Sequence, residues 1–207
     1  MLYDFNSVAL RGSLKNIESS DISLYLGSNF HFVLYPVNRN KEFNFISIIR
    51  KNLKKEQIVD KNYFENKQFL QSLVNEISSK TSFNLKDKIE NIKSFPIFIS
   101  DKFIKPEEKN IFFVGDALYA FPPSFAQGAS QSIEASKEVY EEIEYSTNCY
   151  YQKRYEKIKT VNSRSITNHF AFHLSNPLAT LIRNVALKYL TKNKKFLENY
   201  LGKIYKN

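Results

Sequence analysis

The sequence predicts a mixed α+β fold in which a β-sheet region precedes a largely helical region. Two segments rich in β-branched and aromatic residues, 29–36 and 42–49, indicate strands near the start of the chain. Helical patterns dominate beyond residue 145. Between these regions, the apolar run 111–114 ends abruptly in a glycine and an aspartate, which predicts a strand, a loop and then a helix.

The composition is that of a soluble globular protein. The chain has 207 residues, of which 43% are hydrophobic, enough to form a real core in one large domain or two small ones. No apolar run approaches the ~18 residues of a membrane span, and the first residues lack the pattern of a signal peptide. Cys149 is the only cysteine, so no internal disulfide can form, and a cytoplasmic location is expected.

A net charge of +9 leaves three kinds of anionic partner open: nucleic acid, a membrane surface or an anionic substrate. A simpler cause is codon bias, because the abundant Lys, Asn, Ile, Phe and Tyr all have A/T-rich codons. The lysines are scattered among acidic residues and form no long block. Nucleic-acid binding is therefore not predicted.

The predicted strands 29–36 and 42–49 form an antiparallel hairpin through the polar link 37–41. Side chains alternate across a strand, so the first strand has two distinct faces. We expect one face to pack on the core and the other to be able to line a cleft, although ordinary core packing explains any single residue equally well. The two faces are His31, Val33 and Tyr35, and Phe30, Phe32 and Leu34.

Two further elements are predicted before the glycine-aspartate segment. Residues 62–80 have apolar positions on one helical stripe, namely Leu70, Leu73, Val74 and Ile77. Residues 94–100 indicate another strand, followed by the polar link 105–110.

The last sixty residues are predicted to be helical. Asn176 followed by Pro177 is a typical helix start, and a final helix is expected near the C-terminus. The first of these helices is expected to bury the stripe Leu178, Leu181, Ile182, Val185 and Tyr189; the second carries Leu197, Tyr200, Leu201 and Ile204. Lysines 188, 192, 194, 195, 203 and 206 make this end basic, so contact with an anionic membrane surface is conceivable, although a solvated lysine face is the commoner outcome.

His169 and His173 stand four residues apart, so on a helix they would share a face. No third ligand follows at the spacing of a known zinc motif, which favours a structural role for both and no metal site. No nucleophile-elbow motif is present either.

The glycine-aspartate segment has the features of a ligand-binding turn. Gly115 allows the backbone to turn or a ligand to approach, and Asp116 offers two acceptor oxygens suited to sugar-like hydroxyls. Pro122 and Pro123 stiffen the loop, and a helix is predicted from Gln127 onward. The first turn of that helix favours an anion. One face of the helix carries Ala129, Ile133, Ser136, Tyr140 and Ile143.

This segment resembles the second flavin-contacting motif of the FAD-dependent aromatic hydroxylases, the p-hydroxybenzoate and salicylate hydroxylase family. The matching residues are Gly115, Asp116, Ala117, Pro123, Gln127 and Gly128, whereas Tyr119 replaces the usual histidine and Ala135 an acidic residue. His31, Tyr35, Pro36 and Asn44 similarly resemble the substrate-domain sheet of these enzymes.

The resemblance implies roles for particular residues. Asp116 is expected to bond the ribityl chain of FAD, and the first helical turn to face the N1/C2=O edge of the flavin. The implied cofactor-binding residues are Gly115, Asp116, Pro123, Gln127, Gly128, Ala129 and Ser130. His31, Tyr35 and Pro36 are expected to contribute to the substrate wall.

A dinucleotide-binding motif is missing. The five glycines, at positions 12, 27, 115, 128 and 202, are too far apart to form a Gly-x-Gly-x-x-Gly motif. The sequence therefore shows no binding site for the ADP half of FAD. Residues 7–12 resemble the family's strand that leads into the substrate sheet. The chain thus resembles the C-terminal half alone, without the N-terminal Rossmann part. The expected regions are a substrate-domain-like sheet at 1–108, the C-terminal part of the FAD-binding domain at 109–146 and a helical region at 147–207.

The implied activity is that of an FAD-dependent monooxygenase, in which NAD(P)H reduces FAD and one atom of O2 is added to a small aromatic or similar substrate. The chain alone is expected to bind FAD weakly or not at all, and a separate Rossmann-containing chain is one possible partner. Two other interpretations stay open. The chain could be a non-catalytic remnant or module that binds a small ligand, or a basic protein that binds nucleic acid or a membrane surface.

Overall fold

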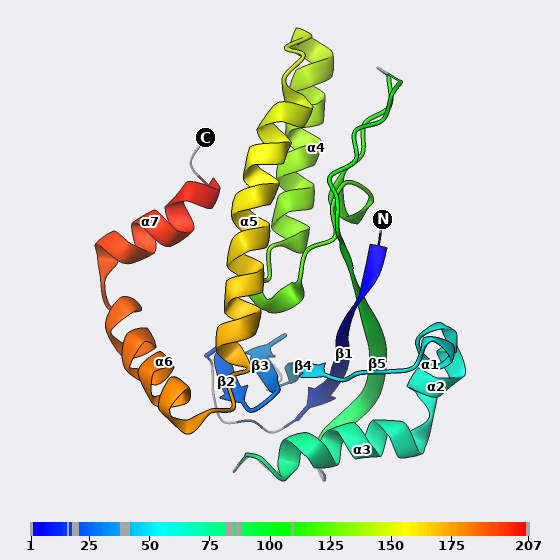
Figure 1. Cartoon of the computed structure of the whole chain (residues 1–207), viewed down its shortest axis with the longest axis vertical. Helices are drawn as coiled ribbons and strands as arrows, with labels where there is room; N and C mark the ends of the chain where they lie inside the picture. The colour runs from blue at the N-terminus through cyan, green and yellow to red at the C-terminus, as the bar shows by residue number, and fades with distance from the viewer. Residues whose placement is uncertain are drawn as a thin grey trace. The chain divides into compact units, whose positions relative to one another are not determined.

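The computed structural model describes residues 2–15, 17, 21–37, 42–81, 85, 88–108 and 110–205 (Figure 1). The chain divides into two compact units. The sheet unit comprises Asp4–Ile97 and Phe172–Ser175, and the helical unit comprises Met1–Tyr3, Phe98–Ala171 and Asn176–Asn207.

The sheet unit is built on five strands in the order β2-β3-β4-β1-β5. They are β1 (Leu2–Leu14), β2 (Ser23–Gly27), β3 (Phe30–Pro36), β4 (Phe43–Arg50) and β5 (Ile89–Ser100). β3 pairs antiparallel with β4, which confirms the predicted hairpin, and β4 pairs antiparallel with β1. Most of the predicted link 37–41 lies outside the described residues.

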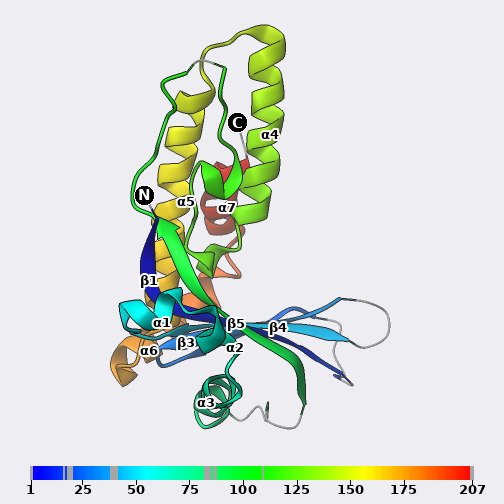
Figure 2. The ribbon, with the colours of Figure 1, turned by 90° about the vertical axis from the view of Figure 1, so that its right-hand side faces the viewer.

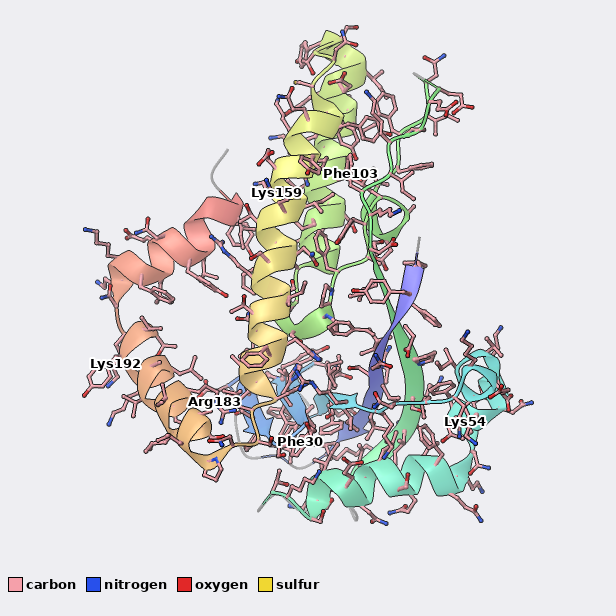
Figure 3. All side chains as sticks on the ribbon, viewed as in Figure 1. Phe30, Lys54, Phe103, Lys159, Arg183 and Lys192 are labelled. Carbon is pink, nitrogen blue, oxygen red and sulfur yellow. The ribbon has the colours of Figure 1, made fainter. Side chains whose placement is uncertain are left out.

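The core of this unit lies between the sheet and the helix α3 (Lys67–Ser78), which runs along one face of the sheet (Figure 2). Phe30, Phe32 and Leu34 supply one face of β3 to this core, as alternation predicts, and Phe30, labelled in Figure 3, is fully buried. α3 contributes Phe69, Leu73, Val74 and Ile77.

The single helix predicted over 62–80 is wrong, because the structure has two helices there. After α1 (Lys55–Val59), α2 (Lys61–Glu65) ends just before Asn66, and α3 begins just after it. The Asn66 side chain accepts hydrogen bonds from the backbone N–H groups of Gln68 and Phe69. An asparagine that caps a new helix start in this way competes with continuation of the preceding helix.

The helical unit contains four long helices. They are α4 (Gly128–Tyr145), α5 (Tyr150–Phe172), α6 (Pro177–Leu190) and α7 (Lys194–Tyr205). α4 and α5 lie side by side (Figures 1 and 2). The buried positions of α5 recur every three or four residues, so this helix has one continuous inner face: Tyr150, Arg154, Ile158, Val161, Ser165 and His169.

The strand predicted at 111–114 is not formed. The backbone at Val114 is extended, with φ −134° and ψ 157°. However, the Tyr151 hydroxyl donates to the Ile111 carbonyl and accepts from the Phe113 N–H, and the Tyr150 hydroxyl donates to the Phe113 carbonyl. Because tyrosine side chains occupy these backbone groups, no neighbouring strand pairs with them.

The prediction that α6 buries its apolar stripe is also wrong. The predicted start is confirmed, since the Asn176 side chain accepts from the N–H groups of Leu178 and Ala179. The stripe itself faces solvent, with exposed fractions of 67% for Leu178 and 70% for Tyr189. The periodicity identified the apolar face correctly, but nothing among the described residues covers it. Within the described part of the chain, no helix combines the length and apolar character needed to cross a membrane.

Candidate functional site

The glycine-aspartate turn is a short 3-10 helix, Gly115–Ala117. Gly115 has φ +59°, a left-handed conformation that favours glycine. A Cβ at this position would lie 2.8 Å from the Ser132 hydroxyl oxygen of α4, so the turn packs closely against that helix. The Asp116 side chain is exposed beside it. The aspartate predicted to bind the ribityl chain is thus close to the beginning of α4.

The loop from this turn to α4 is constrained by two prolines. Pro122 is buried, and Pro123 is the first residue of a second 3-10 helix, Pro123–Phe125. Ala126 then adopts φ +51°, which turns the chain into α4. The two prolines that were predicted to stiffen this segment therefore lie in a loop with a defined backbone conformation.

The predicted helix start at Gln127 is confirmed, because Gln127 is the N-cap residue of α4. Among the described residues, no side chain caps the N-terminal N–H groups of this helix. Ala129 and Ser130 are exposed, and a Cβ built on Gly128 would meet no atom within 4 Å. An uncapped and accessible helix start of this kind suits a negatively charged or hydrogen-bond-accepting group.

Gln127 itself is buried and has a structural contact. Its side-chain amide donates to the Tyr205 hydroxyl of α7 at 2.8 Å. The side chain of Gln127 is therefore engaged in joining α4 to α7.

Charged side chains connect α4 to α5. Arg154, which is 1% exposed, forms ion pairs with Glu138 and, at 3.0 Å, with Glu134. Lys157 approaches Glu134 at 2.8 Å. Burial alone would raise the pKa of Glu134, but its hydrogen bond to Lys157 and the charges of Arg154 and Lys157 outweigh burial, so the pKa lies below the usual glutamate value.

Tyr150 and Tyr151 hold the extended run that precedes Gly115. Burial raises the pKa of Tyr150 to about 12, so its hydroxyl remains protonated and donates to the Phe113 carbonyl at 2.7 Å. Sequence reasoning missed both tyrosines and Arg154. The available signal was the recurrence of Tyr150, Arg154 and Ile158 on one helical stripe, which marks a buried face but not its partners.

The cavity at the glycine-aspartate turn is too small for a flavin. The cavity lined by Gly115, Gly128 and Arg154 has a volume of about 10 Å³, on the scale of a single water molecule. The exposed Asp116 and the accessible start of α4 instead form an open surface. The residues are suited to forming one wall of a flavin site, with the ring outside this cavity.

The three residues predicted to contact substrate all lie on β3 in the sheet unit. His31 is buried, and its Nδ1 lies 2.8 Å from Nε2 of His173 in the same unit. The Asn44 side-chain amide donates to the Tyr35 hydroxyl at 2.5 Å, and Pro36 is exposed at the strand end. His31 is therefore part of the packed interior of the sheet unit, whereas Pro36 is accessible to solvent.

His169 and His173, four residues apart, contact different partners. His169 Nδ1 lies 3.1 Å from the Ser124 hydroxyl oxygen, and His173 contacts His31. Among the described residues, no group of three or more His, Cys, Asp or Glu side chains is arranged to hold a metal ion.

Comparison with known proteins gives similarity at the level of structure. No protein-family model and no curated protein sequence matches the chain. A variant of Klebsiella pneumoniae HpxO complexed with FAD matches 96% of this chain with a TM-score of 0.75 and 14% identity, and HpxO complexed with FAD and uric acid matches 97% with a TM-score of 0.73 and 11% identity. A salicylate hydroxylase substrate complex matches 92% with a TM-score of 0.64 and 14% identity.

The chain has the fold of the C-terminal half of the FAD-dependent aromatic hydroxylases. It spans 53% of each HpxO chain and 55% of the salicylate hydroxylase chain. The predicted fold class is thereby confirmed. At identities of 11–14% the likeness is one of fold.

Proposed function

We propose that the chain is the C-terminal portion of an FAD-dependent monooxygenase that hydroxylates an aromatic or similar small organic substrate with NAD(P)H and O2. The observation that supports this most directly is the pairing of the exposed Asp116, beside a left-handed Gly115, with the uncapped start of α4. This pairing occurs in a fold that matches structures complexed with FAD. The chain is expected to be inactive without the remaining half of that fold.

In this proposal, one group of residues binds the ribityl hydroxyls of FAD and another group binds its ring system. The Asp116 carboxylate accepts hydrogen bonds from the ribityl hydroxyls, and Gly115 allows the close backbone turn that presents it. The N–H groups of Gly128, Ala129 and Ser130 face the electron-rich edge of the ring system. Pro123 and Gln127 fix the loop that joins these groups, Gln127 through its bond to Tyr205.

FAD, when bound, would supply the redox and oxygen chemistry, and the protein residues would supply binding, orientation and exclusion of water. For this reason no catalytic acid–base pair is assigned. The proposed substrate residues are His31, Tyr35 and Pro36, with Tyr35 positioned by its hydrogen bond from Asn44. Uric acid in one HpxO structure is a flat ring compound, the class of substrate that we propose here.

The test is FAD retention by the completed assembly. The chain is produced together with a dinucleotide-binding half, and flavin content is measured by absorbance after desalting. Asp116→Ala should reduce FAD retention by about tenfold or more, because an acceptor of hydrogen bonds from the ligand is lost. Glu144→Ala removes another exposed carboxylate from the opposite end of α4 and serves as the matched control.

Unchanged flavin content in Asp116→Ala would contradict the role assigned to this residue. Tight FAD binding by the chain alone, measured by fluorescence quenching, would contradict the view that a second half is required. NAD(P)H consumption in the assembly, with an added aromatic acid or purine, distinguishes an enzyme from a non-catalytic ligand-binding module.

A further inference from the structure

The segment 124–127 leads directly into the first turn of α4. Within it, Ala126 has φ +51°, a left-handed conformation that is unfavourable for a residue with a Cβ. A backbone conformation of this kind persists where surrounding contacts hold it. The contacts made by this segment therefore decide where the N–H groups of Gly128, Ala129 and Ser130 point.

The C-terminal helix α7 contacts this segment directly at two points. The Tyr205 hydroxyl accepts a hydrogen bond from the Gln127 side-chain amide at 2.8 Å. The ring of Tyr200 meets the ring of Phe125 edge to face, with 5.8 Å between the ring centroids. Because Gln127 is buried, removal of the Tyr205 hydroxyl would take an acceptor away from a donor that water reaches poorly.

A third contact runs through α5 to the other end of the segment. The Tyr200 hydroxyl donates to Oδ1 of Asn168 at 2.9 Å, and the Asn168 amide donates to the Ser124 carbonyl at 3.4 Å. Burial raises the pKa of Tyr200, so its hydroxyl keeps the proton that it donates. α7 thus acts on Gln127 directly and on Ser124 through Asn168.

α7 is itself held in place by two cations of α5. Lys157 donates to the Ile204 carbonyl in the last turn of α7, where a positive charge is favourable. Arg164 donates to the Tyr200 carbonyl, and its guanidinium lies 4.8 Å from the centroid of the Tyr200 ring. Lys157 also pairs with Glu134 of α4 at 2.8 Å. These contacts join α4, α5 and α7 into one support for the segment 124–127.

We propose that α7 positions the flavin-facing start of α4, with Tyr205 and Tyr200 as positioning residues that act through the segment 124–127. The inference rests on the proposed function and adds the element that keeps the cofactor-binding turn in shape. A turn that is ordered before binding loses less conformational entropy when the ligand arrives, so it binds the ligand more tightly. A change in α7 therefore alters flavin affinity without removing an assigned cofactor contact.

Hydrogen exchange on the full chain alone tests the support directly, because it needs no FAD. The reporters are the amides of Ala126 and Gln131, which donate to backbone carbonyls within the loop and the first turn of α4. Tyr205→Phe should speed their exchange about fivefold, since one hydrogen bond is lost, and Tyr200→Phe should have an effect of similar size. Tyr189→Phe removes a hydroxyl at a 70% exposed position on α6 and is the matched control, with unchanged exchange.

The flavin role is tested in the assembly with the dinucleotide-binding half, by the dissociation constant for FAD. Tyr205→Phe should raise this constant about fivefold. In a chain that already carries Gln127→Met, the same substitution should change it by less than about twofold, because the hydrogen bond is already absent. A general loss of stability would weaken FAD binding equally in both backgrounds, so this comparison separates positioning from mere structural support.

Three results would overturn the positioning proposal. One is unchanged exchange at Ala126 and Gln131 in both α7 variants. Another is faster exchange in Tyr205→Phe with an unchanged dissociation constant for FAD. The third is equal weakening of FAD binding with and without Gln127→Met. Failure of the unaltered assembly to retain FAD would contradict the proposed function, while the exchange rates would still decide whether α7 holds the start of α4.

Discussion

The strand β3 and the helix α4 are both amphipathic, yet they place their apolar faces differently. Phe30, Phe32 and Leu34 of β3 are buried in a core completed by α3. Ile133 and Tyr140 of α4 are exposed, and the opposite side of that helix, which carries Ala135 as well as the carboxylates paired with Arg154, meets α5. The difference shows that periodicity identifies the face of an element that is able to be buried, while burial depends on whether a partner element is present.

The difference also predicts where stability resides. In the sheet unit, apolar burial within the described chain should dominate. Between α4 and α5, the ion pairs of Arg154 add to an apolar cluster that includes Ala135, Tyr150 and Ile158. The outer face of α4 should contribute almost nothing until it is covered.

Phe32→Ala should have the largest effect, a loss of about 3–5 kcal/mol of unfolding free energy, because a fully buried aromatic ring leaves a cavity in the sheet core. Urea denaturation monitored by circular dichroism measures the loss. Phe95→Ala removes the same ring from a 45% exposed position on β5 and should cost about 1 kcal/mol or less. Equal losses of unfolding free energy in the two variants would contradict the expected difference between buried and exposed aromatic positions.

Arg154→Met should cost about 3 kcal/mol, because Glu138 would keep its buried carboxylate without the cation that pairs with it. The pH dependence sharpens this result. The pKa of Glu134 is lowered in the fold, so its contribution is present above the ordinary glutamate pKa of about 4.3 and is lost as the pH falls through the lower folded value. Between pH 7 and pH 3 the variant should lose less measured stability than the unaltered chain, because the loss on acidification comes from the lowered pKa of Glu134 and part of that lowering disappears with Arg154.

Gly115→Ala should destabilise the helical unit by about 1–2 kcal/mol, since a Cβ would meet Ser132 and the left-handed backbone is strained for alanine. Gly128→Ala is the opposite case. It adds a Cβ in open space at the first helical position and should be neutral or stabilising by up to about 1 kcal/mol. Thermal unfolding of the two variants tests the expected difference in sign.

Ile133→Ser should have the smallest effect, within about 0.5 kcal/mol in the isolated chain, because the side chain is 73% exposed. Denaturant titration of the isolated chain provides the measurement. A loss as large as that of Phe32→Ala would mean that this face is covered within the chain itself, and the comparison between β3 and α4 would no longer hold.

Much of the fold followed from local patterns. Alternation at Phe30, Phe32 and Leu34 and the aromatic strands 29–36 and 42–49 predicted the hairpin and its core face. The start of α4 at Gln127 and that of α6 after Asn176 followed from local signals. The spacing of Gly115, Asp116, Pro123 and Gln127 led to a fold that the solved structures confirm.

The remaining features required tertiary structure, because they depend on residues distant in the sequence. Residues 111–114 have the composition of a strand, yet Tyr150 and Tyr151 take the hydrogen bonds that a neighbouring strand would otherwise provide. The apolar periodicity of α4 and α6 identified their apolar faces but not their exposure. Composition and spacing by themselves indicated the hairpin, α4 and α6 and the apolar side of each, but they gave a strand at 111–114 that does not form and one helix over 62–80 where there are two. Only the packed chain decided what each side meets, since burial and backbone pairing are properties of two partners.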